Sequence, residues 1–270
     1  MKNKAIGVFD SGLGGLTAVK ELMKCLPNEN IVYFGDTGRV PYGTRSKETI
    51  IKYAAQDAKF LLTHNVKMII AACGTVSSVA SDMGKELSVI FSGVLEPTAQ
   101  ACAKATKTGS VAILGTSATI NSHSYKNLIN RINPDIKVYE QACPLFVPLV
   151  ENGFTDKSDI IVKSVVERYV SQFKDTEVDT VILGCTHYPL LKSAIGECLG
   201  DKVTLIDSGK ETALYTAKLL KEKELLSERS DEGTCEFYVS DTPHNFDTIA
   251  GLFLGNNMKS SATRIDIEKY

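Results

Sequence analysis

The sequence predicts an α/β protein of two pseudo-symmetric lobes, each a mostly parallel sheet flanked by helices. Residues 68–75 and 181–189 share one shape, a short apolar run rich in Ile and Val that leads to a cysteine with a threonine close behind. Such runs are typical of strands buried on both faces of a parallel sheet. Residues 110–119 resemble residues 5–16, and the two pairs of similar segments have similar separations along the chain. A repeat of this length indicates a domain duplication.

The duplication predicts how the chain is divided. We expect residues 1–95 together with 208–270 to form the first α/β lobe, and residues 96–207 to form the second. The portion after the second lobe holds only a helix, a strand and a short helix. Because that portion is too small for a domain, we expect it to return to the first lobe and complete its sheet.

Composition and charge favour a globular protein that acts on small or polar molecules. Hydrophobic residues make up 43% of the 270 residues and charged residues 23%, which excludes disordered and fibrous classes. The formal net charge is −2 and no long basic cluster is present, so we expect no nucleic-acid partner. The apolar segment near the start runs only from Ala5 to Phe9, too short for a signal sequence, and no run is long enough for a membrane helix. The sequence therefore predicts a cytoplasmic protein without a membrane partner.

The cysteines are seven in number, widely scattered and without C-x-x-C spacing. An odd, scattered set argues against both a disulfide framework and a structural zinc site. We therefore expect reduced thiols in a reducing compartment and no bound metal.

The first strand, residues 5–9, leads through a glycine-rich turn into a helix that begins near Leu16. Asp10 opens this turn, where it is either the N-cap of the helix or a catalytic carboxylate. The glycines at 12–15 lack the full G-x-G-x-x-G pattern, so they support a dinucleotide site only weakly. They also allow the backbone to approach a ligand closely.

The next elements alternate between strand and helix. A strand at 31–35 precedes a ten-residue loop at 36–45, which is longer than an ordinary βα connection. A helix is expected over 46–64, then a strand over 67–72 that ends at Cys73, a helix after it, and a brief strand at 89–91. Long loops at the C-terminal ends of strands tend to serve the ligand.

In the second half, the strand that opens at Ser110 is followed by a stretch at 142–153 with two prolines, which we expect to be a loop over the site. Its single charge, Glu151, is either a solvated loop residue or a helper of the chemistry. The strand over 179–184 ends at Cys185. A helix over 210–226, a strand over 235–240 and a short helix over 246–254 are expected in the remaining part.

Cys73 and Cys185 both follow strand C-termini, which is where open α/β sheets bind ligands. If the two lobes face one another, the two thiols stand on opposite walls of one cleft. One thiolate could then remove a proton from a ligand carbon while the other thiol returns a proton on the opposite face. Because a free thiol has a pKa of about 8.5, a neighbour must favour the thiolate, and Asp10 and His187 are the nearest candidates in sequence. The alternatives are that the cysteines are small buried hydrophobes and that His187 is structural.

Four stretches together resemble the cofactor-independent glutamate racemases of the aspartate/glutamate racemase family. They are FDSGLGGL (9–16), GDTGRVPYG (35–43), AAC-x-T (71–75) and LGCTHYPLL (183–191), in order over nearly the whole chain. The resemblance implies two α/β lobes with the active site in the cleft between them. It implies an isomerase that interconverts L- and D-glutamate with no pyridoxal phosphate or metal, supplying D-glutamate for peptidoglycan synthesis and the cell wall. A homodimer is possible, since members of the family are often dimeric.

Carried over by position, the resemblance implies that Cys73 and Cys185 are the two acid/base groups, supported by Asp10 and His187 and helped by Glu151. The implied substrate pocket is lined by Asp10, Ser11, Tyr42, Gly43, Gly74, Thr75, Thr116, Ser117, Thr119, Thr186 and His187. One position departs from the family, which usually has Asn after the first cysteine where this chain has Gly74. The loss of that amide could be offset by backbone N–H groups or by a changed substrate pose, or it could signal a different acidic amino acid.

Two other functions stay open from the sequence. One cysteine could act as a covalent nucleophile in acyl transfer or hydrolysis, in which case the other thiol would be replaceable. The chain could also be a binding module that closes on an amino acid without turning it over.

Overall fold

The computed structural model describes residues 1–241, 246–255 and 262–270, and its strands form two sheets. The larger sheet has six strands in the order β10-β9-β2-β1-β3-β4, and the smaller has four in the order β6-β5-β7-β8. All the neighbouring strands pair in parallel. The strands of the larger sheet are β1 (Ala5–Asp10), β2 (Ile31–Gly35), β3 (Val66–Ala71), β4 (Ile90–Gly93), β9 (Cys235–Val239) and β10 (Thr263–Arg264). Those of the smaller sheet are β5 (Ser110–Gly115), β6 (Lys137–Ala142), β7 (Thr180–Leu183) and β8 (Thr204–Asp207).

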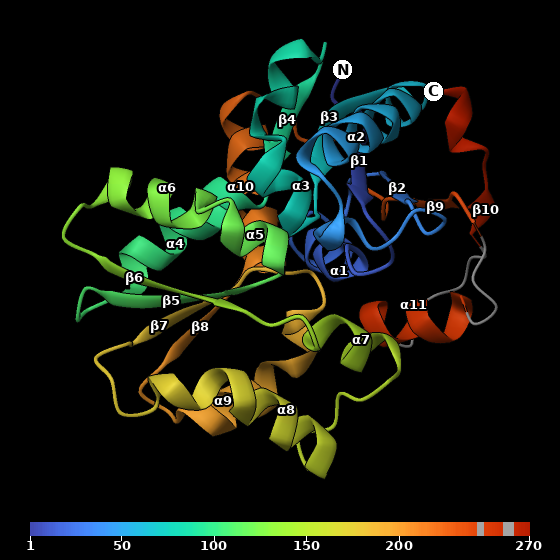
Figure 1. Cartoon of the computed structure of the whole chain (residues 1–270). Helices are drawn as coiled ribbons and strands as arrows, with labels where there is room; N and C mark the ends of the chain where they lie inside the picture. Colours follow the sequence, from blue (N-terminus) through green and yellow to red (C-terminus); the bar gives the residue numbers. More distant parts are fainter. Residues whose placement is uncertain (242–245, 256–261) are drawn as a thin grey trace.

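The duplication inferred from the sequence is visible in the strand order. The run β2-β1-β3-β4 in the first sheet has the same arrangement as β6-β5-β7-β8 in the second. In this correspondence β3 and β7 are equivalent, and each leads to one of the two candidate cysteines. The expected fold of two α/β lobes is confirmed, and Figure 1 shows the two sheets side by side with helices around them.

Helices cover the faces of both sheets. Two of them, α2 and α4, pack directly on the strands of the first and second sheet respectively, while α10 packs against both α1 and α4 and so joins the two lobes. The helices are α1 (Leu16–Cys25), α2 (Lys47–Leu62), α3 (Gly74–Val79), α4 (Leu95–Ala105), α5 (Ser117–Asn121), α6 (Ser124–Ile132), α7 (Phe146–Glu151), α8 (Ile160–Val170), α9 (Lys192–Leu199), α10 (Ser208–Glu222) and α11 (Phe246–Leu254). Short 3₁₀ turns are η1 (Tyr42–Thr44), η2 (Ser81–Glu86), η3 (Ser171–Phe173), η4 (Tyr188–Leu191) and η5 (Ile267–Lys269).

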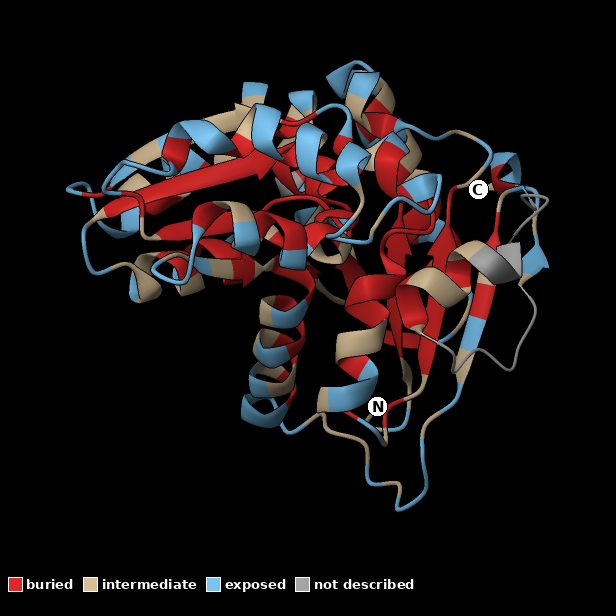
Figure 2. Cartoon of the chain, turned by 90° about the horizontal axis from the view of Figure 1, so that it is seen from below, coloured by how far each residue is buried: buried red, intermediate tan, exposed pale blue. Residues whose placement is uncertain are grey.

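The largest hydrophobic core runs through both lobes. Val8 of β1, Leu114 of β5 and Leu183 of β7 are fully buried in one cluster of contacting side chains. Figure 2 shows the central strands buried and the outer faces of the helices exposed. The lobes therefore share a packed interior, which limits how far they can move apart. Within the described ranges, no helix has the length and apolar character needed to cross a bilayer.

One expectation from the sequence is wrong. The stretch at 142–153 is not entirely a loop, because Phe146–Glu151 forms the helix α7. Pro148 is the third residue of this helix, and the first turn of a helix has no intrahelical partner for its N–H groups. Proline therefore does not break the helix there, and α7 presents Glu151 at its C-terminal end.

Candidate active site

The ends of β1 and β3 place Asp10 and Cys73 at the same edge of the first sheet. Phe9 lies opposite Ala71 in the parallel register, and the N–H of Ala72 donates to the carbonyl of Phe9 at 2.9 Å. Cys73 then begins the turn into α3. The second lobe repeats this arrangement, since β7 ends at Leu183 and Cys185 follows one glycine later. Local strand geometry thus delivers both thiols to the region between the lobes.

A cavity of about 360 Å³ lies between these strand ends, and both cysteines line it. Its wall contains most of the residues implied by the resemblance, namely Ser11, Tyr42, Gly43, Cys73, Gly74, Thr75, Thr116, Ser117, Glu151, Cys185, Thr186 and His187. The cavity is therefore assembled from both lobes, and its size suits a small molecule.

Asp10 and Thr119 lie behind this wall and do not line the cavity. Asp10 is fully buried, and one of its oxygens accepts the N–H of Gly12 at 3.0 Å. Its other oxygen has no hydrogen-bond partner among the described residues. Burial raises the pKa of Asp10, so this carboxyl is predisposed to take a proton. It is not the N-cap of α1, whose N-cap residue is Gly15.

A chain of hydroxyl groups crosses from one lobe to the other at the cavity. The hydroxyl of Thr75 lies 3.0 Å from that of Thr116, which in turn lies 3.0 Å from that of Thr119. Thr119 is thus in place to orient Thr116, although it is not in a position to contact a ligand in the cavity.

Cys185 has a histidine at its side. The Nδ1 atom of His187 lies 3.8 Å from the sulfur, and its Nε2 atom lies 3.1 Å from Oε1 of Glu151. Burial opposes a charge on this ring, but the hydrogen bonds to Cys185 and Glu151 outweigh it and raise the pKa of His187 to about 10. The ring is therefore an imidazolium at neutral pH, and its positive charge lies beside the sulfur of Cys185.

Cys73 has a different environment. Its thiol lies 3.5 Å from the hydroxyl of Ser11, to which it donates. Burial raises the pKa of the Cys73 thiol to about 12, and the nearby carboxyl of Asp10 adds to the rise. At neutral pH the site therefore pairs a protonated thiol on one wall with a sulfur held beside an imidazolium on the other.

The sequence profile of the Asp/Glu/Hydantoin racemase family matches residues 17–216, which is most of the chain. The chain belongs to this family. It is 46% identical over 256 residues to the glutamate racemase of Geobacter metallireducens, with 94% of each chain covered. It also resembles the crystal structure of Francisella tularensis glutamate racemase in complex with D-glutamate (TM-score 0.92, 41% identity, 100% of both chains). A glutamate racemase of Bacillus anthracis gives a TM-score of 0.93 at 35% identity over 98% of both chains.

The expected family and enzyme class are thereby confirmed, and the enzyme is an amino-acid racemase, an isomerase. In this racemase no group of three or more His, Cys, Asp or Glu side chains within the described part of the chain is arranged to hold a metal ion. The polar side chains that line the cavity beside the two thiols carry hydroxyl groups or belong to one histidine–glutamate pair.

The loop after β2 is held by a buried network that the sequence did not reveal. The Tyr42 hydroxyl donates to Asp36 and lies 3.1 Å from Asp57, so this group points away from the cavity that the rest of Tyr42 lines. Arg39 pairs with Asp36 at 2.6 Å and with Asp57 at 3.2 Å, and it stacks over the ring of Tyr53. Burial, together with the charge of Asp36, raises the pKa of Asp57 well above its usual range. The sequence signal that could have revealed this network is Asp57, a charged residue on the buried face of α2.

One wall of the cavity is largely apolar, and the sequence indicated its segments but not its individual residues. It contains a third cysteine, Cys143, which is fully buried and whose thiol donates to the carbonyl of Gln141 at 3.6 Å. The remaining lining residues belong to the two segments that the sequence placed at the site, 36–45 and 142–153, and are Val40, Pro41, Thr44, Pro144, Val147 and Pro148. Outside the cavity, the ring of Phe253 in α11 packs edge-on against His187 at 5.3 Å between centroids. These contacts shield the thiols from water.

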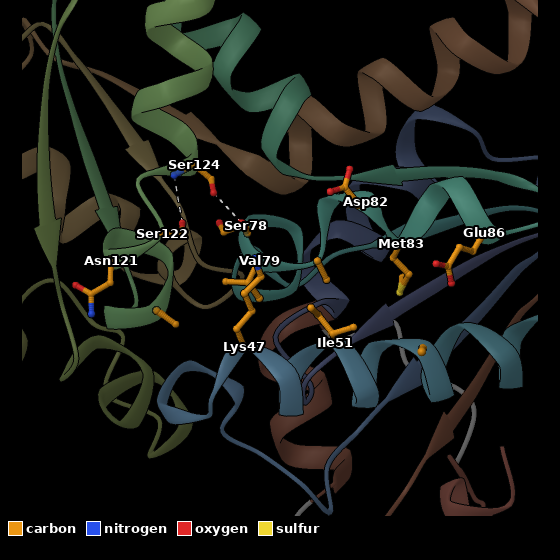
Figure 3. A pocket seen from close by; sticks show the side chains of 13 residues that line it. Lys47, Ile51, Ser78, Val79, Asp82, Met83, Glu86, Asn121, Ser122 and Ser124 are labelled. Carbon is orange, nitrogen blue, oxygen red and sulfur yellow. Dashed lines mark hydrogen bonds between the residues drawn. The ribbon is translucent and has the colours of Figure 1, made fainter.

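A second cavity, of about 620 Å³, lies between α2, the α3–η2 segment and α5, and neither Cys73 nor Cys185 lines it (Figure 3). Its charged side chains are of mixed sign, Lys47 against Asp82 and Glu86. At its edge the hydroxyl of Ser124 donates to the carbonyl of Ser78 at 2.7 Å, which is a further hydrogen bond between the lobes.

Proposed function

We propose that this enzyme is a glutamate racemase that interconverts L- and D-glutamate by proton transfer between two cysteines and the α-carbon. The observation that carries the proposal is that Cys73 and Cys185 line one cavity from the two lobes. The names of the relatives support glutamate as the substrate, since the Geobacter protein is a glutamate racemase and the Francisella structure contains D-glutamate. As in the resemblance drawn from the sequence, the product would supply D-glutamate for peptidoglycan synthesis.

In the proposed reaction the resting site holds Cys185 as a thiolate and Cys73 as a thiol. The Cys185 thiolate takes the α-proton of the enantiomer whose α-hydrogen faces it, and Cys73 gives its proton to the opposite face of the planar carbanion. The product is the other enantiomer, with Cys185 now a thiol and Cys73 a thiolate. The same steps in reverse convert the second enantiomer, so no proton is gained or lost over a cycle.

The neighbours of each sulfur have proposed roles that follow from their contacts. The His187 imidazolium stabilises the Cys185 thiolate, and Glu151 stabilises the imidazolium through the 3.1 Å contact. When the resting site meets the second enantiomer, the Cys73 thiol must first become a thiolate and Cys185 a thiol. The nearby carboxyl of Asp10, which has one unpartnered oxygen, accepts the Cys73 proton, and Cys185 takes a proton from solvent. The hydroxyl and N–H groups of the lining residues, among them Ser11, Thr75 and Thr186, donate to the glutamate carboxylates, and lining oxygen atoms accept from the ammonium group.

The direct test is to incubate the enzyme with L-glutamate in deuterated water without pyridoxal phosphate. D-glutamate that carries α-deuterium is the expected product. Cys73→Ala and Cys185→Ala should each abolish inversion, whereas the control Cys25→Ala, at the end of α1 outside the cavity, should retain it. Full activity in either active-site variant contradicts the two-base assignment.

The same variants separate the two other functions that the sequence left open. A covalent nucleophile would need only one of the two thiols and would accumulate an acyl-enzyme adduct detectable by mass spectrometry. A binding module would retain glutamate without incorporating deuterium. The peptidoglycan role is tested by expression in a bacterial strain without its own glutamate racemase, which should then grow without added D-glutamate. The cytoplasmic location and the homodimer stay predictions.

A further inference from the structure

The two lobes come into close contact beside the catalytic sulfurs, where Gly74 faces Gly184. Gly74 directly follows Cys73, and Gly184 directly precedes Cys185. A Cβ atom placed on Gly74 would lie 2.4 Å from the carbonyl oxygen of Gly184 and 3.8 Å from the Cα of Cys185. Because Cβ atoms essentially never come within 3.0 Å of such neighbours, any side chain at 74 requires the two chain segments to separate.

The backbone on the Gly184 side is held in place. The N–H of Gly184 donates to the carbonyl of Leu114 in β5 at 2.8 Å, which continues the pairing of β7 with β5. On the other side, the carbonyl of Cys73 accepts the N–H of Ser77 in the first turn of α3. Both contacting segments are thus part of regular structure in their own lobe. A displacement is therefore expected to move one lobe relative to the other.

Space, not backbone conformation, is what requires glycine at position 74. The glycines with φ in the left-handed region are Gly109, Gly153, Gly200 and Gly255, and Gly74 is not among them within the described residues. An alanine could therefore adopt the local backbone of position 74 without strain. The alanine would therefore act only by increasing the distance between the lobes.

Short hydrogen bonds depend on the same distance. The hydroxyl of Thr17 donates to the carbonyl of Thr186 at 3.0 Å, in addition to the Thr75–Thr116 and Ser124–Ser78 contacts. Hydrogen bonds weaken steeply when they lengthen beyond their normal range, so all of these contacts favour the close approach. Figure 3 shows the Ser124–Ser78 contact.

We propose that Gly74 is a positioning residue that sets how closely the Cys73 and Cys185 thiols approach the α-carbon, by letting the two lobes close on each other. This inference rests on the proposed two-cysteine reaction. It differs from the expectation that Gly74 marks a lost substrate-binding amide. In this structure the asparagine usual in the family would meet the Gly184 carbonyl before its amide could serve the substrate.

The experiment compares Gly74→Ala and Gly74→Asn with the wild type in deuterated water, starting from each enantiomer. It measures kcat, KM and the ratio of deuterium in the recovered starting enantiomer to inverted product. When the thiols are farther apart, one thiolate still removes the α-proton on its own side. The opposite thiol then delivers its proton late, and the carbanion is reprotonated on the side it left, after exchange with solvent. The ratio of exchange to inversion therefore rises.

We expect Gly74→Ala to lower kcat by roughly 10- to 100-fold, the scale of a misplacement near 1 Å, with a smaller change in KM. Gly74→Asn should lower kcat at least as much. The exchange-to-inversion ratio should rise in both variants, and partial unfolding cannot mimic this because it lowers exchange and inversion together. The control is Gly196→Ala in α9, where the added methyl has its nearest neighbour at 3.7 Å and both rates should stay as in the wild type.

The outcomes distinguish this inference from the proposed function. A wild type that neither inverts nor exchanges glutamate refutes the proposed function, and the inference with it. If the wild type is active, an unchanged ratio in Gly74→Ala overturns the inference alone. A lower KM with undiminished kcat in Gly74→Asn also overturns it, since that result supports a missing amide. Loss of both exchange and inversion in a folded Gly74 variant also overturns the inference. The inference requires that one thiolate can still remove the α-proton on its own side.

Discussion

Replacing Glu151 by glutamine removes the charge that faces His187 while it keeps the size and hydrogen-bonding capacity of the side chain. The two side chains are 3.1 Å apart, with His187 8% exposed and Glu151 41% exposed. Because Glu151 is well solvated, its charge is worth roughly 1 kcal/mol to the imidazolium, which corresponds to about 0.7 of a pH unit. The contact between His187 and Cys185 remains in the variant.

The sign of the effect follows from the direction of the pKa shift. The pKa of His187 is raised to about 10 in the folded enzyme, so the ring keeps its positive charge through neutral pH and loses it as the pH rises through about 10. In Glu151→Gln the pKa of His187 is lower, so the ring loses its charge at a lower pH. The alkaline limb of kcat/KM should therefore shift to lower pH by somewhat less than one unit, and kcat/KM near pH 8 should fall less than about tenfold.

The assay is racemisation of each glutamate enantiomer, followed by circular dichroism from pH 6 to pH 10.5. Glu140→Gln is the matched control, because Glu140 faces His123 at 2.7 Å in a second His–Glu pair that does not line the active-site cavity. An alkaline limb that does not move, or that moves equally in the control, refutes the role of Glu151 as a support of His187. A loss greater than about 100-fold at all pH values would instead indicate direct proton transfer by Glu151.

Two further predictions concern stability. Lys67 is fully buried and donates to Glu29 and to two carbonyl groups, so Lys67→Met should lower the free energy of unfolding by about 3–5 kcal/mol in urea titrations. Addition of Glu29→Leu should recover part of that loss, because no unpaired charge then remains. Burial opposes the charge of Asp179, yet hydrogen bonds from Thr106 and neighbouring N–H groups lower its pKa to about 2. Asp179→Asn should therefore cost roughly 1–2 kcal/mol above pH 4, and the difference from wild type should vanish as the pH falls through about 2. A constant difference across that range would contradict this assignment.

The sequence was sufficient for the fold class and for most of the predicted residues that the structure brings together around one cavity. An apolar run such as Met68–Ala72 or Val181–Leu183 indicates a buried strand, because a strand covered on both faces needs apolar side chains at every position. The strand ends then fix which residues can reach a ligand, and this is why Cys73, Cys185 and His187 could be selected without coordinates. Edge strands such as β6 gave a weaker pattern, because only part of each side chain is buried there.

What the sequence could not supply are contacts between segments that are distant along the chain. Nothing local to Gly74 says that the carbonyl of Gly184 lies against it, or that the Tyr42 hydroxyl turns away from the cavity toward Asp57. By itself, the sequence determined two duplicated α/β units and the residue types at their strand ends, since local periodicity and composition encode these. Only the tertiary structure decided how closely the two units pack and which neighbour tunes each thiol, because burial and electrostatic interactions depend on distances in space.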